Sequence, residues 1–267
     1  MNSLNGGIRP MTGAVGAELI GVDLGNPSLF ADIQAAVLQY GVVFFRGQRL
    51  TCEQEVAFAA ALGSVSPTVN LRKVERNPLI DEVRKEPGDN RALGDTWHSD
   101  QTFHQRPPRY TMLFAKETPP VGGDTSFIGM AAAYDALSDS LKSVLGGLRA
   151  VHIDSGPFGQ NRFEGRADVA QAIHPVVVRL PVSGRKALYV NPDKTIQFAG
   201  WTREESAGLL DFLYRHAQKP EFGCRFRWDA ESVAVWDNFQ TWHYATNDYP
   251  GQRRVMHRIT VSADHFE

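Results

Sequence analysis

The sequence has few of the features that mark secreted, membrane-spanning or nucleic-acid-binding proteins. Its 267 residues include only two cysteines, Cys52 and Cys224, and they form no CxxC pair, so no disulfide framework is predicted. No apolar run approaches the roughly 18 residues that would predict a membrane span. The first residues lack the basic-then-apolar pattern of a secretory signal. The net charge of -2 gives no electrostatic case for nucleic acid. We therefore expect a cytoplasmic protein without membrane or nucleic-acid partners.

Strand-like runs dominate what is present. They are rich in β-branched and aromatic residues and are bounded by Gly, Pro, Asn or Asp, as in GAELIGVDL, GVVFFRG, RYTMLFAKE, SVAVWDN and RRVMHRITVS. Many short strands with few helices predict a sandwich, a barrel or a jelly roll. No internal repeat, low-complexity segment or linker divides the chain, so residues 1–267 are interpreted as a single domain.

Helical periodicity occurs in four segments, residues 30–40, 51–63, 131–148 and 202–217. Two of them open with capping-box spacing, Thr51 with Gln54 and Thr202 with Glu205. We expect these helices to pack outside a β core.

Two stretches, residues 86–96 and 154–168, fit neither the strand pattern nor the helix pattern. Both are rich in glycine and polar residues. Each can be a loop over a site or a plain surface connection, and composition does not separate the two interpretations.

The motif WHSDQTF, residues 97–103, sets two possible metal ligands one residue apart. On a strand, His98 and Asp100 would point the same way, as a chelating pair requires. Alone, the motif is weak evidence for a metal, and a hydrogen-bonded pair or a solvated loop explains it better. A third ligand is available in His243, which follows a strand-like segment. Two imidazoles and one carboxylate leave an open face for dioxygen and a chelating cosubstrate, as in non-haem Fe(II) oxygenases.

Two arginines follow His243 at a spacing of four residues. On a strand, Arg254 and Arg258 would share a face, with Cα atoms roughly 13 Å apart. Arginines that point into a cavity are costly unless each meets an anion. One arginine could hold the far carboxylate of a dicarboxylic cosubstrate, and the other an anionic group of the substrate. Arg253 and His257 would fall on the opposite face, in solvent.

Taken together, the chain resembles the taurine dioxygenase and chlorophenoxyacetate dioxygenase family of Fe(II)/2-oxoglutarate-dependent dioxygenases. The resemblance runs nearly end to end, through GAVGAELIGVDL, GVVFFRGQ, WHSDQTF, GGDTSF, HPVVVRLPVSGRKALYVN, VWDN and HYATNDYPGQRRVMHR. It implies an α+β, mainly β fold, a double-stranded β-helix (jelly roll) with flanking helices. It also implies a homodimer or homotetramer.

The resemblance assigns a cofactor site. It implies that Fe(II) is bound by His98, Asp100 and His243, which are thereby the catalytic centre. It implies that 2-oxoglutarate is held at its distal carboxylate by Arg254 and by the hydroxyl of Thr125. Bending at Gly122 and Gly123 would let Thr125 reach the cosubstrate.

For the substrate, the resemblance implies that Arg258 faces an anionic group. Gln101, Thr68 and Phe158 are further candidate contacts. Thr68 stands near the place where the taurine enzyme has a histidine, and Gly94 stands where it has an asparagine. We therefore expect a substrate other than taurine, and the motifs are closer to the aryloxyalkanoate branch.

The implied reaction uses Fe(II), 2-oxoglutarate and O2 and yields succinate and CO2. It would hydroxylate an unactivated C–H of a small organic anion, an aryloxyalkanoate-like carboxylate or a sulfate ester or sulfonate, with cleavage of a C–O or C–S bond where the carbon carries one. The same cofactors could instead drive desaturation or cyclisation in natural-product biosynthesis. A zinc hydrolase has no use for Arg254, and an anion-binding β-barrel leaves the His, Asp and His unexplained.

Overall fold

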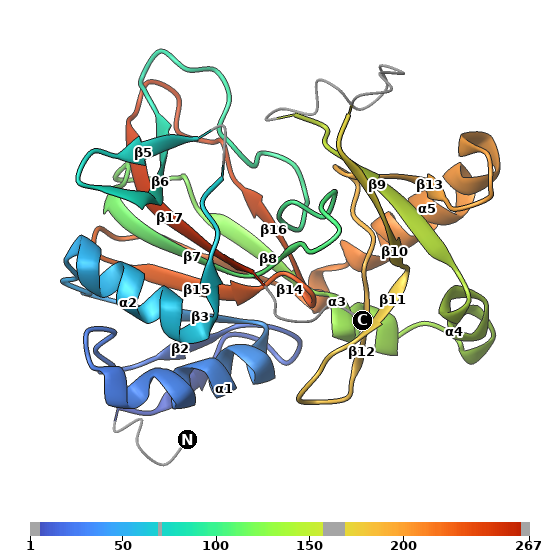
Figure 1. The fold of residues 1–267 in the computed structure, drawn as a ribbon, viewed down its shortest axis with the longest axis horizontal. Helices are drawn as coiled ribbons and strands as arrows, with labels where there is room; N and C mark the ends of the chain where they lie inside the picture. The colour runs from blue at the N-terminus through green and yellow to red at the C-terminus, as the bar shows by residue number, and fades with distance from the viewer. Residues whose placement is uncertain (1–5, 69–70, 157–168, 263–267) are drawn as a thin grey trace.

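A computed structural model describes residues 6–68, 71–156 and 169–262 of the chain. In this part of the chain, the structure is mostly strand with some helix, and its main feature is a mixed sheet of nine strands (Figure 1). Strands β2 and β3 pair in parallel and the other neighbours antiparallel. The order is β1 (Ile8–Pro10), β2 (Ala17–Leu19), β3 (Val42–Phe45), β15 (Val233–Asp237), β7 (Pro108–Glu117), β17 (Arg254–Ser262), β6 (Asn77–Lys85) and β5 (Arg72–Val74), with β4 (Ser64–Val65) beside β17.

A smaller sheet lies against one face of the large sheet. Its strands are β14 (Gly223–Phe226), β8 (Thr125–Gly129) and β16 (Thr241–Ala245). Between the sheets, the ring of Phe127 packs edge-on against Phe44 and against Trp236, with 5.5 Å between ring centroids in both pairs. Burial of such rings contributes roughly 1.5–3 kcal/mol each, so these aromatics hold the two sheets together.

The opposite face of the large sheet is covered by α1 (Phe30–Tyr40) and α2 (Cys52–Leu62), next to η1 (Pro27–Leu29). Strand β3 shows why both faces are apolar: Val43 and Phe45 pack toward the helices, whereas Val42 and Phe44 pack toward the smaller sheet. Because the strand is buried on both faces, its sequence is continuously hydrophobic and does not alternate between apolar and polar residues.

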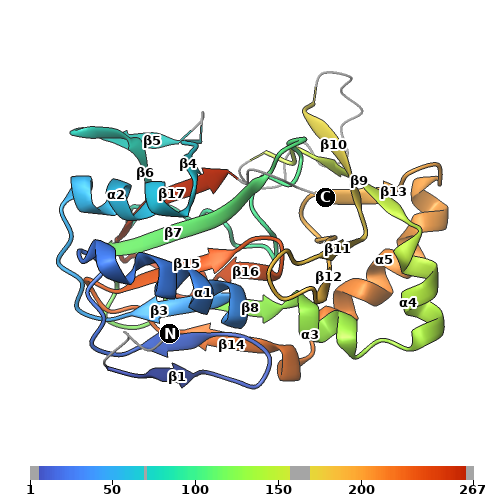
Figure 2. The ribbon, with the colours of Figure 1, turned by 60° about the horizontal axis from the view of Figure 1, so that its bottom comes forward.

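The remaining elements form a separate layer, seen at the right of Figures 1 and 2. Helix α5 packs on β13 of a three-stranded sheet, and α3 packs on the β12 strand of a hairpin. These elements are α3 (Met130–Asp135), α4 (Asp139–Gly146), β9 (Arg149–Ile153), β10 (Gln171–Pro175), β11 (Val177–Arg179), β12 (Lys186–Leu188), β13 (Thr195–Phe198), α5 (Arg203–Ala217) and η2 (Pro220–Phe222).

All four segments with helical periodicity are helical, and both capping boxes, at Thr51 and Thr202, are present. Residues 131–148 fall in two helices, as the pattern allowed. The prediction of one long strand over residues 16–24 is wrong. Gly16 and Gly21, at φ 88° and 67°, turn the chain on either side of the short strand β2. None of the helices in the described ranges combines the length and apolarity that a membrane crossing needs.

Candidate functional site

Two histidines from distant parts of the chain are joined by their backbones. The N–H of His98 donates to the carbonyl of His243 (3.1 Å), and the N–H of His243 donates to the carbonyl of His98 (2.8 Å). Their ring centroids lie 4.1 Å apart. A shared direction for His98 and Asp100 was expected on the supposition that they lie on a strand, but only this single bridge forms, and Asp100 already lies in a turn. The bridge nevertheless directs both imidazoles to the same side.

Three donor atoms converge beside this bridge. The Oδ1 atom of Asp100 lies 3.7 Å from Nε2 of His98 and 3.8 Å from Nε2 of His243. Nδ1 of His98 lies 2.8 Å from the carbonyl oxygen of Thr96, and donation there leaves the Nε2 lone pair facing Asp100. Burial holds the pKa of His243 well below its usual value, so its imidazole is neutral. The two imidazole nitrogens and the carboxylate oxygen of this group suit a divalent metal ion.

The Asp100 carboxylate is fixed from several directions. The hydroxyl of Thr111 donates to Oδ2 (2.7 Å), and the Arg258 guanidinium donates to Oδ1 (2.8 Å). Its backbone N–H donates to Oδ1 of Asn238 (3.1 Å). Burial alone would raise the pKa of Asp100, but the charge of Arg258 and the hydrogen bond from Thr111 bring it well below its usual value. Thr111 and Asn238 were not among the predicted site residues: Asn238 ends the VWDN motif, but the motif gave it no role at the site, and Thr111 lies within a strand-like run without a site motif.

Gln101, Thr68 and Arg258, three of the four predicted substrate residues, contact one another. The hydroxyl oxygen of Thr68 accepts from Nε2 of Gln101 (2.8 Å) and from Nη1 of Arg258 (3.0 Å), so its own proton is left to donate. Gln101 has a φ of 46°, a strained conformation for a residue other than glycine and one that clusters at functional sites. The fourth, Phe158, lies outside the residues that the structure describes.

Arg254 and Arg258 share a face of β17, as expected, but their surroundings differ. Arg258 is paired with Asp100 and lies 3.9 Å from Asp81, so its charge is already balanced within the chain. The expectation that Arg258 needs an outside anion to balance its charge is therefore wrong. Arg254 is 5 % exposed, and within the described residues its Nε and Nη2 atoms have no hydrogen-bond partner. Burial lowers its pKa.

Thr125 lies in the same cavity as Arg254. The indole N–H of Trp228 donates to the Thr125 hydroxyl oxygen (2.9 Å), which leaves the hydroxyl proton to donate elsewhere. The guanidinium of Arg254 lies 5.8 Å from the Trp228 ring. A buried guanidinium with open donors beside a free hydroxyl proton is suited to bind a carboxylate.

The cavity that joins these groups has a volume of about 200 Å³. Residues of β7, β8, β15, β16 and β17 line it, and its apolar lining includes Leu113 and Trp236. Lys194, which sequence reasoning missed, also lines it, with its Nζ atom 2.8 Å from Oδ2 of Asp193 and 2.6 Å from Oγ of Ser155. No sequence signal marks Lys194, because the fold alone brings it to the cavity.

The GGDT motif turns the chain before β8. Gly122 and Gly123 have φ values of 83° and 69°, the left-handed region that favours glycine. A Cβ on Gly122 would lie 2.6 Å from Oδ1 of Asp248, which accepts the Gly123 N–H (2.8 Å). The expected bend is confirmed, and it places Thr125 at the first position of β8.

Comparison with known proteins identifies the family. The family model described as taurine catabolism dioxygenase TauD, TfdA family matches residues 7–260. The chain belongs to this family. It is therefore an oxidoreductase of the Fe(II)/2-oxoglutarate-dependent dioxygenases, which use Fe(II), 2-oxoglutarate and O2.

Three relatives show the range within the family. An alpha-ketoglutarate-dependent sulfate ester dioxygenase of Pseudomonas putida is 33% identical over 96% of this chain and 89% of its own. An alpha-ketoglutarate-dependent 2,4-dichlorophenoxyacetate dioxygenase of Cupriavidus pinatubonensis is 32% identical, and the match covers 87% of this chain and 88% of the relative. The crystal structure of a taurine dioxygenase from Burkholderia xenovorans superposes with a TM-score of 0.83 at 38% identity. The superposition covers 97% of this chain and 91% of that chain.

The bend at Gly122 generates a stability prediction. Gly122→Ala should lower the free energy of unfolding by more than Gly251→Ala, and denaturant titration measures both. Each variant carries a left-handed alanine, which costs about 1–2 kcal/mol. Gly251, at φ 70°, has no atom within 4 Å of an added Cβ, so the comparison isolates the contact with Asp248. Equal losses in the two variants would show that Asp248 moves aside freely.

Proposed function

We propose that His98, Asp100 and His243 hold the Fe(II) ion through Nε2, Oδ1 and Nε2. The observation that carries the proposal is the convergence of these three atoms within 4.8 Å of one another at a buried point. The carbonyl of Thr96 fixes the His98 tautomer, and Thr111 holds the second oxygen of Asp100. When bound, Fe(II) with 2-oxoglutarate supplies the oxidising chemistry, in which O2 is consumed and succinate and CO2 are released.

The distal carboxylate of 2-oxoglutarate is assigned to Arg254 and Thr125. Support comes from the guanidinium of Arg254, which is buried with open donors, and from the Thr125 hydroxyl, whose oxygen already accepts from Trp228. An unpaired buried charge costs several kcal/mol, and a bound carboxylate removes that cost. Binding therefore fixes the cosubstrate at its far end while its keto acid end faces the metal position.

The substrate is a small organic anion whose charged group lies against Thr68, Gln101 and Arg258. Thr68 has a hydroxyl proton to donate, and Arg258 adds a positive charge next to it. Because Arg258 also contacts Asp100, an anion bound here lies beside the metal position. A carbon close to that anion is then the carbon that reacts, and the apolar lining with Leu113 and Trp236 receives the rest of the substrate.

This placement favours substrates whose reacting carbon carries oxygen or sulfur. Hydroxylation of such a carbon gives an unstable product that loses the attached group, so a sulfate ester, a sulfonate or an aryloxyalkanoate would be cleaved. The relatives that act on a sulfate ester and on 2,4-dichlorophenoxyacetate support the sulfate ester class and the aryloxyalkanoate class. A screen that measures succinate release across these classes tests the proposal, and analysis of the organic product separates hydroxylation from desaturation and cyclisation.

The architecture is also part of the proposal. The nine-stranded sheet facing the β14-β8-β16 sheet, with the aromatic core between them, supports a double-stranded β-helix, or jelly roll, formed as one domain. A homodimer or homotetramer follows from the family resemblance. A cytoplasmic location is supported by the free thiols of Cys52 and Cys224.

The metal assignment predicts the effect of removing a ligand. His98→Ala and His243→Ala should each abolish substrate-dependent succinate formation and reduce bound iron, because two protein ligands hold Fe(II) weakly. His104→Ala is the matched control, since it removes an exposed imidazole from the same loop. Iron analysis and a succinate assay measure the outcome. Full turnover with normal iron in either ligand variant would contradict the assignment.

The cosubstrate assignment predicts a contrast between adjacent arginines. Arg254→Met should weaken 2-oxoglutarate binding by about 2–4 kcal/mol, the cost of losing a charge-assisted contact. Thr125→Val should cost about 1 kcal/mol, since only a hydroxyl donor is lost. Arg253→Met, which removes a half-buried arginine paired with Glu86 and Glu117, should leave the affinity unchanged. Titration of 2-oxoglutarate against the Fe(II) protein measures all three, and equal affinities for Arg254→Met and wild type would place the anion pocket elsewhere.

The substrate assignment predicts a change in KM. Arg258→Met should raise the KM of the best anionic substrate strongly and increase 2-oxoglutarate consumption without product, because the substrate is held less firmly. Thr68→Val, which leaves the Arg258–Asp100 contact in place, should raise KM by a smaller factor with the iron content intact. Steady-state kinetics measure both. A neutral or cationic best substrate, or a loss of 2-oxoglutarate affinity in Thr68→Val, would contradict the assignment.

A further inference from the structure

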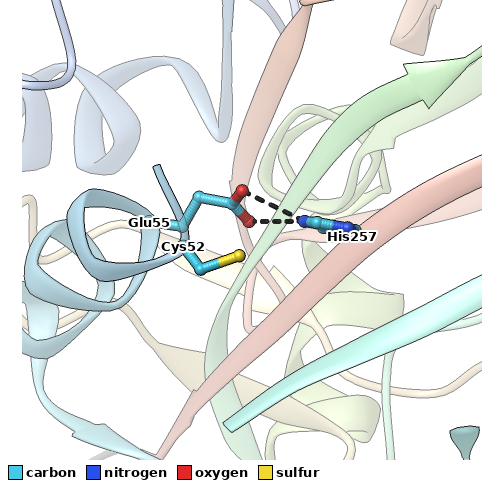
Figure 3. Close-up of side chains that lie close together, drawn as sticks. All are labelled: Cys52, Glu55 and His257. Atoms are coloured by element: carbon cyan, nitrogen blue, oxygen red, sulfur yellow. Dashed lines mark hydrogen bonds and ion pairs between the residues drawn. The ribbon is translucent and has the colours of Figure 1, made fainter. Parts of the chain in front are cut away.

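A second group of metal-ligating side chains lies on the other side of β17 from the proposed active site. Figure 3 shows Cys52 and Glu55, one helical turn apart on α2, facing His257 on β17. One donor atom from each lies within 4.8 Å of the other two. His257 was expected in solvent, but its side chain is only 11% exposed, so that expectation is wrong.

The spacing of the histidine and carboxylate donors is close to that in a tetrahedral metal site, and the Cys52 sulfur lies within 4.8 Å of both. Nδ1 of His257 lies 3.0 Å and 3.1 Å from the two carboxylate oxygens of Glu55. Zinc–ligand bond lengths place tetrahedral ligand atoms about 3.3–3.6 Å apart, so an ion fits between the histidine and the carboxylate after a small outward movement. Cys52 and Glu55 are three residues apart in the first turn of the helix, so their side chains already share one face.

The charges also suit a divalent cation. The Glu55 side chain is 1% exposed, and a buried carboxylate needs a compensating positive charge. A thiolate, a carboxylate and a neutral imidazole around a divalent ion give a site of zero net charge. Burial and the carboxylates of Glu55 and Glu53 raise the pKa of the Cys52 thiol, and a bound metal ion reverses this by direct coordination. Cys52 is only partly buried, which leaves a path for the ion and for water.

We propose that Cys52, Glu55 and His257 form a second metal site that takes Zn(II), with water as the fourth ligand. Binding displaces the thiol proton of Cys52 and moves the proton of the Glu55–His257 hydrogen bond away from Nδ1, and it involves no redox change. The thiolate favours Zn(II) over the Fe(II) of the active site. The bound ion would join α2 to β17 directly behind Arg258, the neighbour of His257.

Cobalt substitution tests the site in the full-length wild-type protein, reduced with a phosphine that does not compete for metal. Thiolate-bound Co(II) absorbs in the near ultraviolet by charge transfer, whereas the His98, Asp100 and His243 group contains no sulfur and adds nothing there. Wild type should show this band, Cys52→Ser should lose it, and Cys224→Ser is the matched control that keeps it. A missing wild-type band, or a band that survives in Cys52→Ser, overturns the proposal.

Zinc stoichiometry provides a second measurement. Wild type and Cys224→Ser should bind one Zn(II) more per chain than Cys52→Ser. His257→Gln keeps a hydrogen bond to Glu55 and should still fold, but its Co(II) affinity at the thiolate site should fall by more than about tenfold. Equal zinc content in wild type and Cys52→Ser, or unchanged cobalt affinity in His257→Gln, overturns the proposal. Dioxygenase activity is not part of either measurement, so the result does not depend on the proposed function.

Discussion

Two reciprocal backbone hydrogen bonds join His98 to His243, and the geometry of the site depends on them. They attach an otherwise irregular loop to β16, and further hydrogen bonds from Ala245 N–H to the Gly94 carbonyl and from the Ser99 hydroxyl to the Thr241 carbonyl hold it there. Because the backbone bridge fixes both Cα positions, the two imidazoles face the same way without help from a regular strand. The turn that follows brings Asp100 back toward the same point, at the expense of a strained φ at Gln101. Main chain thus positions His98 and His243, two of the proposed metal ligands, whereas side chains of Thr111, Asn238 and Arg258 hold the third, Asp100.

Electrostatics separate the two arginines of β17, although both point into one cavity. Arg258 lies against Asp100 and close to Asp81, so it is held in place before any ligand arrives. Arg254 faces the cavity with open donors, and this makes it the stronger anion-binding group. A ligand carboxylate at Arg254 would remove a desolvation cost, whereas an anion at Arg258 would share the guanidinium with Asp100. The proposed substrate site and the proposed metal site would therefore be coupled through Arg258.

Strand β17 also links the two faces of the large sheet. Arg254, Met256 and Arg258 point toward the smaller sheet, while His257 points toward α2 and meets the buried carboxylate of Glu55. Alternation along a single strand thus places the proposed active site and the proposed zinc site back to back. A change in the packing of α2 against His257 would reach Arg258 through one peptide unit.

The sequence by itself determined the helices, both capping boxes, the turn at Gly122 and Gly123, and the grouping of His98, Asp100 and His243, because these depend on local spacing and on motifs. Only the tertiary structure decided which groups meet. Thr111 and Lys194 reach the site from separate elements and carry no local signal, and Asn238, although it ends the VWDN motif, gained a role only from its contact with Asp100. Period-two alternation placed His257 on the outer face but did not reveal that α2 covers that face. The charge balance of Arg258 likewise depends on Asp81 and Asp100, residues distant in sequence whose approach is fixed by sheet pairing and core packing.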